Sequence, residues 1–331
     1  MSYALLRSVA RMGFGAALAT ATALVPAMAT AQNVKNYPER AITMVVPFGP
    51  GSVTDLLARI VAKGMGEDLG QSVVVHNKAG AGGNIGAAEV AAAAPDGYTL
   101  LVGPTSTNAV NPSLFSNLKF GIDDFTPISN LAKVPNVLVV HPDLPVKSVQ
   151  ELIALSKEKE LAYASGGTGG SMHLAAELFA RMSGAKMLHV AYKGGGAALS
   201  DLLPGRVDAM FCNLPVCLPH IESGKLRALG VTSSQASPLL PEVGPIADQG
   251  LAGYDVTGWF GLFAPANVDP AIIEKLNASL MKVLDDEGVK KQLLAQGAEP
   301  DGSSPADFDK FVRAEHDKWA QVIKEAGISI E

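Results

Sequence analysis

Short apolar runs alternate with amphipathic segments along most of the chain. The first such pair is a β-branched run at residues 42–46 and, after a loop with Gly49, Pro50 and Gly51, a segment of helical periodicity. Apolar side chains recur on one face of that segment at Leu56, Leu57, Ile60, Val61, Met65 and Leu69. The pattern predicts a strand, a tight loop and an amphipathic helix.

The same alternation predicts further elements downstream. We expect strands at residues 73–75, 98–102, 137–140, 161–164, 187–190, 209–211, 227–231 and 259–264. We expect helices at residues 85–94, 148–158, 171–182 and 196–203, and in two C-terminal segments that open at Asp269-Pro270 and Ser304-Pro305. Residues 233–253, rich in Pro, Gly and Ser, indicate a connector. Strands that alternate with helices are typical of an α/β fold with mostly parallel sheets.

The order of strand, glycine-rich loop and helix N-terminus occurs twice. In the first copy Ser52 is a good N-cap, and Asp55 three residues later completes a box-like pair. In the second copy, S-G-G-T-G-G-S-M-H at residues 165–173 leads into a helix with Ser171 as its N-cap. Free N–H groups and the helix dipole attract an anion to such an N-terminus. A tight turn with a well-made cap is the alternative.

A third loop, G-P-T-S-T-N at residues 103–108, is dense in small hydroxyl and amide side chains and follows an expected strand. Ligands of open α/β sheets bind at such carboxyl ends of strands. The two glycine-rich loops lie roughly 120 residues apart, with a break in composition between them. Two lobes that present these loops to a shared cleft are the economical arrangement.

The N-terminal residues have the pattern of a secretory signal peptide. Arg7 and Arg11 are the only charged residues before Lys35, and residues 12–28 are apolar and rich in alanine. Small-residue cleavage sites follow at A-M-A and A-T-A, so we expect residues 1–31 to be removed and the protein to be exported to the periplasm. A membrane anchor is the alternative, but it needs roughly 20 apolar residues and a stop-transfer flank.

Charge and cysteine content narrow the classes of partner. Loss of the two arginines in residues 1–31 would lower the formal net charge from −6 to −8. An acidic chain without a Lys/Arg cluster is a poor candidate for binding nucleic acid. Cys212 and Cys217, the only cysteines, are compatible with a short disulfide or with two buried thiols, and less so with a metal site.

Catalytic and cofactor motifs are weak in this sequence. There is no H-E-x-x-H, no P-loop lysine, and A-G-A-G-G-N-I-G at residues 79–86 departs from the dinucleotide fingerprint, so we expect no cofactor and no metal. G-G-S-M-H falls one residue short of a nucleophile elbow, and Ser171 and His173 at i, i+2 do not face each other on a helix. An exported hydrolase or isomerase that uses Ser171 and His173 remains the alternative to a binding protein.

The candidate residues of the expected cleft are neutral side chains that can donate hydrogen bonds. Such donors suit reversible binding of a carboxylate. These candidates are Ser52, Thr54, Ser106, Thr107, Asn108, Ser165, Thr168, Ser171, Tyr192 and Asn213. Asp55 has a complete structural role as a cap partner, and the alternative is that it meets a ligand ammonium or the water around a carboxylate.

Several segments together resemble the Bug family, the periplasmic solute-binding components of tripartite tricarboxylate transporters. The matching segments, in order along essentially the whole mature chain, are P-F-G-P-G-S-V-T-D-L-L-A-R, N-K-A-G-A-G-G-N-I-G-A, P-D-G-Y-T-L-L, Y-A-S-G-G-T-G-G-S-M-H-L-A-A-E-L-F, A-Y-K-G-G-G-A-A-L-S-D-L-L-P-G-R-V-D-A-M-F and G-W-F-G-L-F-A-P. The family usually has Gly-Gly where this chain has Gly51-Ser52, and N-K-P-G where it has N-K-A-G. These departures leave the identity of the ligand open.

The resemblance implies a two-lobed Venus-flytrap fold (type II) whose chain crosses between the lobes twice. We expect residues 32–131 plus 251–331 in lobe I and residues 132–250 in lobe II, each with a mostly parallel sheet flanked by helices. The loops at residues 47–55 and 165–173 match those that grip the carboxylate in the family. The binding residues we expect are Phe48, Gly51, Ser52, Thr54, Asp55, Ser106, Thr107, Asn108, Ser165, Gly166, Thr168, Gly169, Gly170, Ser171, His173, Tyr192 and Asn213.

The function that follows is capture of a small organic carboxylate by a monomer and its delivery to a membrane permease. We expect no nucleic-acid partner and no enzymatic activity. A receptor that signals to a membrane sensor would have the same sequence features.

Overall fold

The computed structural model describes residues 36–192 and 195–326. The expected signal peptide at residues 1–31 lies outside this part of the chain. The strands of the described part are β1 (Ile42–Val46), β2 (Val73–Asn77), β3 (Thr99–Pro104), β4 (Phe125–Val140), β5 (Leu161–Ser165), β6 (Met187–Ala191), β7 (Ala209–Asn213), β8 (Arg227–Val231), β9 (Thr257–Pro265) and β10 (Glu299–Pro300). Every expected strand is present, most with slightly longer bounds.

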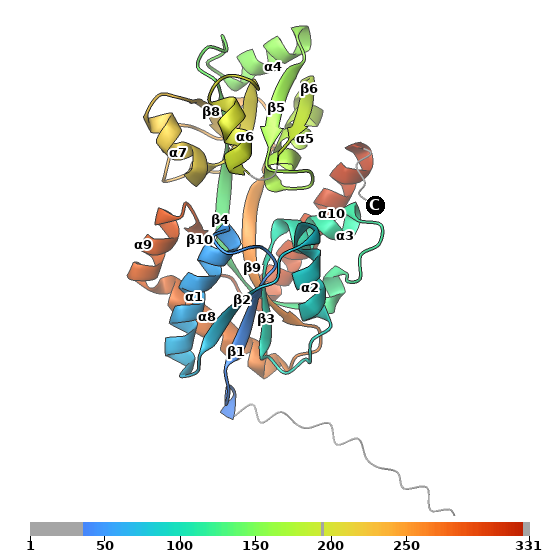
Figure 1. Ribbon diagram of the computed structural model, residues 1–331, viewed down its shortest axis with the longest axis vertical. Helices are drawn as coiled ribbons and strands as arrows, with labels where there is room; N and C mark the ends of the chain where they lie inside the picture. The colour runs from blue at the N-terminus through green and yellow to red at the C-terminus, as the bar shows by residue number, and fades with distance from the viewer. Residues whose placement is uncertain (1–35, 193–194, 327–331) are drawn as a thin grey trace, which may run out of the picture. The chain divides into compact units, whose positions relative to one another are not determined.

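The α-helices follow the expected order between the strands (Figure 1). They are α1 (Val53–Leu69), α2 (Asn84–Ala91), α3 (Asn111–Leu114), α4 (Val149–Glu158), α5 (Ser171–Ser183), α6 (Gly195–Leu202), α7 (Leu214–Glu222), α8 (Pro270–Asp285), α9 (Glu287–Ala295) and α10 (Pro305–Ala326). Short helical turns of other types are η2 (Ala81–Gly83), η3 (Ser106–Val110), η4 (Ile122–Asp124) and η5 (Ala247–Gln249). Within residues 36–192 and 195–326, no helix is both long and apolar enough to cross a membrane.

The strands form two groups that share β4. The first group has the order β2-β1-β3-β9-β4, with β10 also paired to β4, and the second has the order β4-β7-β5-β6, with β8 paired to β4 (Figure 1). Pairings among β1, β2 and β3 and among β5, β6 and β7 are parallel, as βα units require. All pairings that involve β4 or β9 are antiparallel, so the sheet is mixed and more antiparallel than expected.

Strand β4 is much longer than the strand expected at residues 137–140. Its residues 125–135 pair with β9 and its residues 136–140 pair with β7. Pro127 and Pro135 lie within it, and proline is uncommon inside central strands because it lacks an N–H donor. The expected lobe boundary between residues 131 and 132 falls inside this strand, and the residue limits of the lobes stay a prediction.

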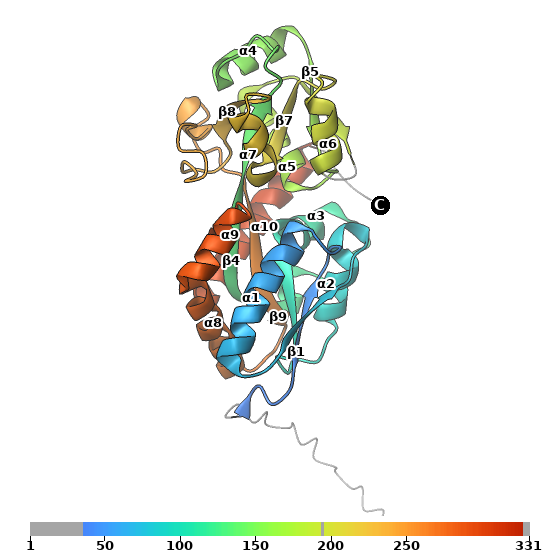
Figure 2. The same cartoon turned by 60° about the vertical axis from the view of Figure 1, so that its left-hand side comes forward.

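Local signals account for several helix starts. Ser52 Oγ accepts the Asp55 N–H, Asp269 Oδ1 accepts the Ala271 N–H, and Ser304 Oγ accepts the Asp307 N–H. Helices α1 and α8 lie side by side (Figures 1 and 2) and share one buried cluster with β1, in which Leu57 and Leu276 are fully buried. Burial of an apolar side chain of this size contributes about 1.5–3 kcal/mol.

Further features differ from expectation, and α3 and β10 are among the elements that were not expected. Helix α7 was not expected, because Pro215 and Pro219 both fall within it. The C-terminal region has three helices where two segments were expected, since Asp286 adopts an extended conformation and caps α9 through the Val289 N–H. Residues 103–108 are not an open loop, because they comprise the end of β3 and the start of η3.

Candidate functional site

A cavity of about 240 Å³ lies where the first turns of α1 and α5 approach β4 and β9. It is lined by Phe48, Ser52, Val53, Thr54, Pro104, Thr105, Ser106, Val134, Gly170, Ser171, Asn213, Gly258, Trp259 and Phe260. Of these described residues, none carries a charged side chain. The lining combines hydroxyl, amide and backbone groups with aromatic and aliphatic surface, which is typical of small-molecule sites.

The N-terminus of α1 forms one end of the lining. Its first N–H groups have no acceptor within the helix, and Val53 and Thr54, which carry two of them, both line the cavity. Ser52 directs its side chain to the cap. This end of the cavity therefore offers backbone donors and the positive end of the helix dipole.

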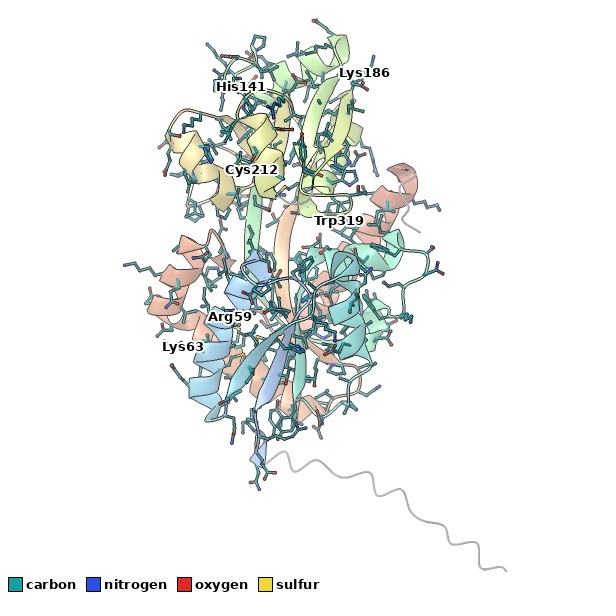
Figure 3. The ribbon with its side chains drawn as sticks, in the orientation of Figure 1. Arg59, Lys63, His141, Lys186, Cys212 and Trp319 are labelled. Atoms are coloured by element: carbon teal, nitrogen blue, oxygen red, sulfur yellow. A yellow bond between two sulfur atoms is a disulfide. The ribbon has the colours of Figure 1, made fainter. Side chains whose placement is uncertain are left out.

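Asp55 lies behind this end and is only 2% exposed. Its Oδ2 accepts hydrogen bonds from the Gly51 N–H at 2.9 Å and from Arg59 Nε at 3.1 Å, and its Oδ1 accepts one from Asn77 Nδ2 at 2.9 Å. Burial alone would raise the pKa of the Asp55 carboxyl, but the hydrogen bonds from Arg59, Gly51 and Asn77 hold the pKa below its usual value. Arg59 projects from α1 (Figure 3). The carboxylate thus organises the loop and does not line the cavity.

The N-terminus of α5 forms the opposite end. The N-cap is Gly170 and not Ser171 as expected, so Ser171 is the first helical residue, and its hydroxyl is not used for capping. Ser171 lines the cavity, and a Cβ placed on Gly258 would lie 3.9 Å from Ser171 Oγ. The preceding Gly169 has φ +80° and packs on Leu114, so a side chain there would be both strained and obstructed.

A cluster of side chains supports this second loop, with His173, Tyr163 and Ser165 buried and His189 and Glu177 partly buried. We call these five residues the histidine cluster. The two imidazoles stack with ring centroids 4.1 Å apart, and Ser165 Oγ lies 2.6 Å from His189 Nε2. His173 Nδ1 accepts the Gly169 N–H at 3.1 Å, and Tyr163 OH donates to Glu177 at 2.8 Å. Burial, aided by His189, lowers the pKa of His173 to about 4, so this imidazole is neutral at pH 7.

Strand β9 supplies the wall between the two ends. Thr105 Oγ1 accepts the Trp259 N–H at 2.9 Å and donates to the Trp259 carbonyl oxygen at 3.2 Å. Trp259 Nε1 donates to Glu315 Oε2 at 3.2 Å, so the indole is held against α10, and Trp259 also lines a second cavity on that side. The hydrogen bonds to Thr105 therefore fix the backbone of β9 at this wall.

Seven of the residues expected to bind ligand line this cavity. They are Phe48, Ser52, Thr54, Ser106, Gly170, Ser171 and Asn213. They come from four segments that are distant in the sequence, so the fold brings together the two glycine-rich loops, the start of η3 and the last residue of β7.

The other ten expected residues do not line it, and most have protein partners. Gly51 and Asp55 complete the α1 cap, Thr107 Oγ1 donates to Asn108 Oδ1 at 2.6 Å, and Tyr192 OH donates to Asp201 Oδ2 at 2.8 Å. Ser165 and His173 belong to the histidine cluster. Gly166, Thr168 and Gly169 form the turn before α5, where Thr168 is exposed.

Sequence reasoning missed half of the lining. The missed residues are Val53, Pro104, Thr105, Val134, Gly258, Trp259 and Phe260. The segment G-W-F-G was noted for its resemblance, and its aromatic character beside two glycines is the one local signal that points to a ligand wall. Val134 carries no such signal.

A second cavity, of about 250 Å³, lies on the opposite face of β4 and β9. Four of its six charged residues form ion pairs, as Lys133 Nζ lies 2.9 Å from Asp301 Oδ2 and Lys318 Nζ lies 3.0 Å from Glu315 Oε1. Neither glycine-rich loop reaches it. In the described part of the chain, no group of three or more His, Cys, Asp or Glu residues is placed to hold a metal ion.

Two strand groups joined through β4, with a neutral cavity between two helix N-termini beside the join, define a two-lobed periplasmic binding protein of type II. The chain belongs to the tripartite tricarboxylate transporter receptor family, whose family model matches residues 57–328.

Known relatives cover nearly the whole chain. Protein BugT of Bordetella pertussis is 41% identical over 299 residues, which are 89% of this chain and 92% of the relative. The structure of Rpa4515 of Rhodopseudomonas palustris with adipate is 38% identical, has a TM-score of 0.78, and covers 88% of this chain and 99% of the other. MatC from the same organism, with bound malate, is 33% identical with a TM-score of 0.74, and covers 87% and 100%.

Proposed function

We propose that the protein captures a small organic carboxylate in the 240 Å³ cavity and delivers it to a membrane permease of a tripartite tricarboxylate transporter. The observation that carries the proposal is the pairing of two helix N-termini across one neutral cavity. Backbone N–H groups and helix dipoles supply positive potential without a fixed cation. This suits an anion that must be held and then released.

The two N-termini favour a dicarboxylate. One carboxylate would meet the Val53 and Thr54 N–H groups and the Ser106 hydroxyl, and the other would meet the N-terminus of α5 with the Ser171 hydroxyl. The apolar residues Phe48, Val134 and Phe260 would cover the carbon chain between them. Relatives with adipate and malate support this class of ligand.

The cavity supports binding without turnover. Ser171 faces the cavity, but the imidazole of His173 is engaged with the Gly169 N–H, and no hydrogen bond between Ser171 and a histidine occurs in the described residues. Ser165 and His189 do form a close pair, yet Ser165 is fully buried. A nucleophile would need its base within hydrogen-bond reach and open to substrate.

The remaining parts of the proposal concern the setting. We propose export through cleavage of residues 1–31, a monomer in the periplasm, and lobes at residues 32–131 plus 251–331 and 132–250. The expected residues outside the lining, apart from the exposed Thr168, would act on the ligand by holding the loops in place. The periplasmic binding proteins in this receptor family support the location.

Calorimetric titration of ligand-stripped protein with malate, adipate and longer dicarboxylates tests the function. We expect at least one of these dicarboxylates to bind. At about 100 times its dissociation constant, the bound ligand should raise the free energy of unfolding by roughly 2.7 kcal/mol. Ser171→Ala should weaken that binding by about 1–3 kcal/mol. Thr168→Ala, an exposed change in the same loop, is the matched control and should leave it unchanged.

Binding of cationic ligands in place of every carboxylate would overturn the anion site. Turnover of a carboxylate or ester that disappears in Ser171→Ala would favour the hydrolase alternative.

A further inference from the structure

Asn136 is a buried polar side chain whose amide is only half used. It is fully buried on β4, and its backbone N–H and carbonyl both bond to Thr232. Its Oδ1 accepts a hydrogen bond from Asn213 Nδ2 at 2.7 Å, but its Nδ2 has no acceptor among the described residues. Buried N–H groups without a partner are rare because leaving one unbonded costs free energy.

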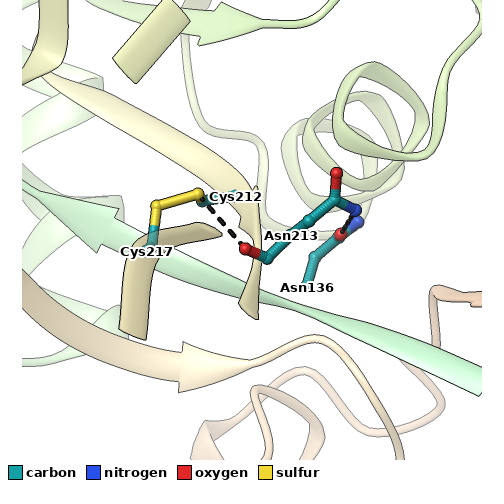
Figure 4. Close-up of a disulfide and its surroundings, with 4 residues drawn as sticks. All are labelled: Asn136, Cys212, Asn213 and Cys217. Carbon is teal, nitrogen blue, oxygen red and sulfur yellow. Dashed lines mark hydrogen bonds between the residues drawn. A yellow bond between two sulfur atoms is a disulfide. The ribbon is translucent and has the colours of Figure 1, made fainter. Parts of the chain in front are cut away.

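This half-used amide lies beside the ligand cavity. Asn136 and Val134 are two residues apart on β4 and therefore share one face of the strand, and Val134 lines the cavity. Asn213, the β7 residue directly opposite Asn136, lines the cavity as well. Figure 4 shows the two side-chain amides turned toward each other, with the side-chain oxygen of Asn213 directed away from Asn136.

Asn213 does not use its side chain as a helix cap, and bonds to Asn136 instead. It occupies the N-cap position of α7, where asparagine normally accepts a hydrogen bond from the helix, yet its side chain makes no cap bond. The disulfide between Cys212 and Cys217 encloses it and ties β7 to α7 (Figure 4). The backbone around Asn213 is thus fixed while its amide points to Asn136 and the cavity.

The pair has two orientations of the same shape. In the first orientation, which the structure has, Asn213 Nδ2 donates its hydrogen bond to Asn136, and the side-chain oxygen of Asn213 is the atom left to face the cavity. If both amides turn over, Asn136 Nδ2 donates to Asn213 Oδ1, and Asn213 leaves an N–H donor for the cavity. The unpaired group on Asn136 is then a carbonyl oxygen, which is tolerated better than an unpaired N–H.

We propose that Asn136 is a positioning residue for the ligand. Its amide orients Asn213, and the orientation of the pair decides whether Asn213 presents a hydrogen-bond donor or an acceptor to the bound group. A bound carboxylate selects the second orientation, because it accepts the hydrogen bond that the Asn213 NH₂ group then donates. Asn136 Nδ2 has its acceptor in that same orientation. This inference rests on the proposed carboxylate site.

Side-chain and backbone amide spectra of uniformly ¹⁵N-labelled protein test the inference on the unmodified chain. Adipate and malate are the probes, and signals lost in Asn136→Leu and Asn213→Ala assign the pair. On saturation we expect the Asn136 and Asn213 NH₂ signals to shift together, with slower exchange for Asn136. If the Ser171 backbone amide shifts and Asn136 does not, the inference is wrong while the proposed function stands. If neither responds to any dicarboxylate, the proposed function is what fails, and the inference falls with it.

Two matched variants separate positioning from a structural role. Asn136→Leu removes the unpaired donor, so we expect thermal stability to be kept or raised while affinity for adipate falls about 10-fold or more, as for one lost bond to a charged group. Asn130→Leu is the control, since Asn130 is also buried on β4 but donates to Asp301 away from the cavity. It should lose stability and keep its affinity. Equal loss of stability in both variants with unchanged affinity would overturn the inference.

Discussion

Acid should destabilise the protein through His173, in a window that the structure defines. Burial and the stacked His189 lower the pKa of this imidazole to about 4, against a reference value of 6.5. As pH falls, the unfolded chain therefore binds a proton before the folded protein does. The stability that depends on neutral His173 is complete above about pH 6.5 and is lost as the pH falls to about 4.

The magnitude follows from the size of the shift. One pKa unit corresponds to about 1.4 kcal/mol, so the whole window removes about 3 kcal/mol, and a fall from pH 7 to pH 5 removes about 2 kcal/mol. His189 acts in the same direction, because burial also lowers its pKa against the opposing charge of Glu177. Protonation of His173 at Nδ1 would also remove the acceptor of the Gly169 N–H, so the loop before α5 should loosen.

Urea denaturation at pH 7, 6 and 5 measures the effect, with His173→Asn as the control. The asparagine Oδ1 can accept the Gly169 N–H but cannot take up a proton in this range. The unmodified protein should lose about 2 kcal/mol more than the variant between pH 7 and pH 5. Equal losses in the two proteins would refute the assignment of a neutral, buried His173.

Three further outcomes test other parts of the site. Asp55→Asn should lower the free energy of unfolding by about 1–3 kcal/mol, because the carboxylate organises Gly51, Arg59 and Asn77, and an unchanged urea midpoint would contradict this. Adipate affinity should be constant from about pH 6 to about pH 9 and depend weakly on salt, because backbone donors do not titrate and the lining is uncharged. Calorimetric titration at several pH values and salt concentrations measures it, and a steep salt dependence would indicate a cationic side chain in the site. Small-angle scattering should show a smaller radius of gyration with saturating adipate, since a ligand held by both loops favours a closed form, and an unchanged radius would contradict closure.

Local chemistry made several helix starts and the succession of strands along the chain predictable. Ser52, Asp269 and Ser304 each cap the helix that their sequence context predicts, because a cap needs only its next three residues. The course of β4 could not be predicted in this way. Its pairing with β9 joins residues more than 100 positions apart. Pro127 and Pro135 also make this segment a poor strand candidate by local propensity.

The same division applies to the site. Ser52, Thr54, Gly170 and Ser171 lie in loops whose glycine content marks them, and they do line the cavity. Ser165 looked equivalent in the sequence, but its hydroxyl bonds to His189 inside the protein. A hydroxyl can be satisfied by a ligand or by the fold, and only the tertiary structure distinguishes the two.

Trp259 gives the molecule an intrinsic optical reporter. The chain has two tryptophans, and the indole N–H groups of Trp259 and Trp319 donate to the same oxygen of Glu315, at 3.2 and 3.0 Å. Trp259 borders the ligand cavity, whereas Trp319 (labelled in Figure 3) lies on α10 beyond the shared carboxylate. Because the two indoles share one acceptor and Trp259 lines the ligand cavity, the combined emission should change when a ligand fills that cavity. Occupancy could then be followed by fluorescence on the native chain, without a dye and without any substitution.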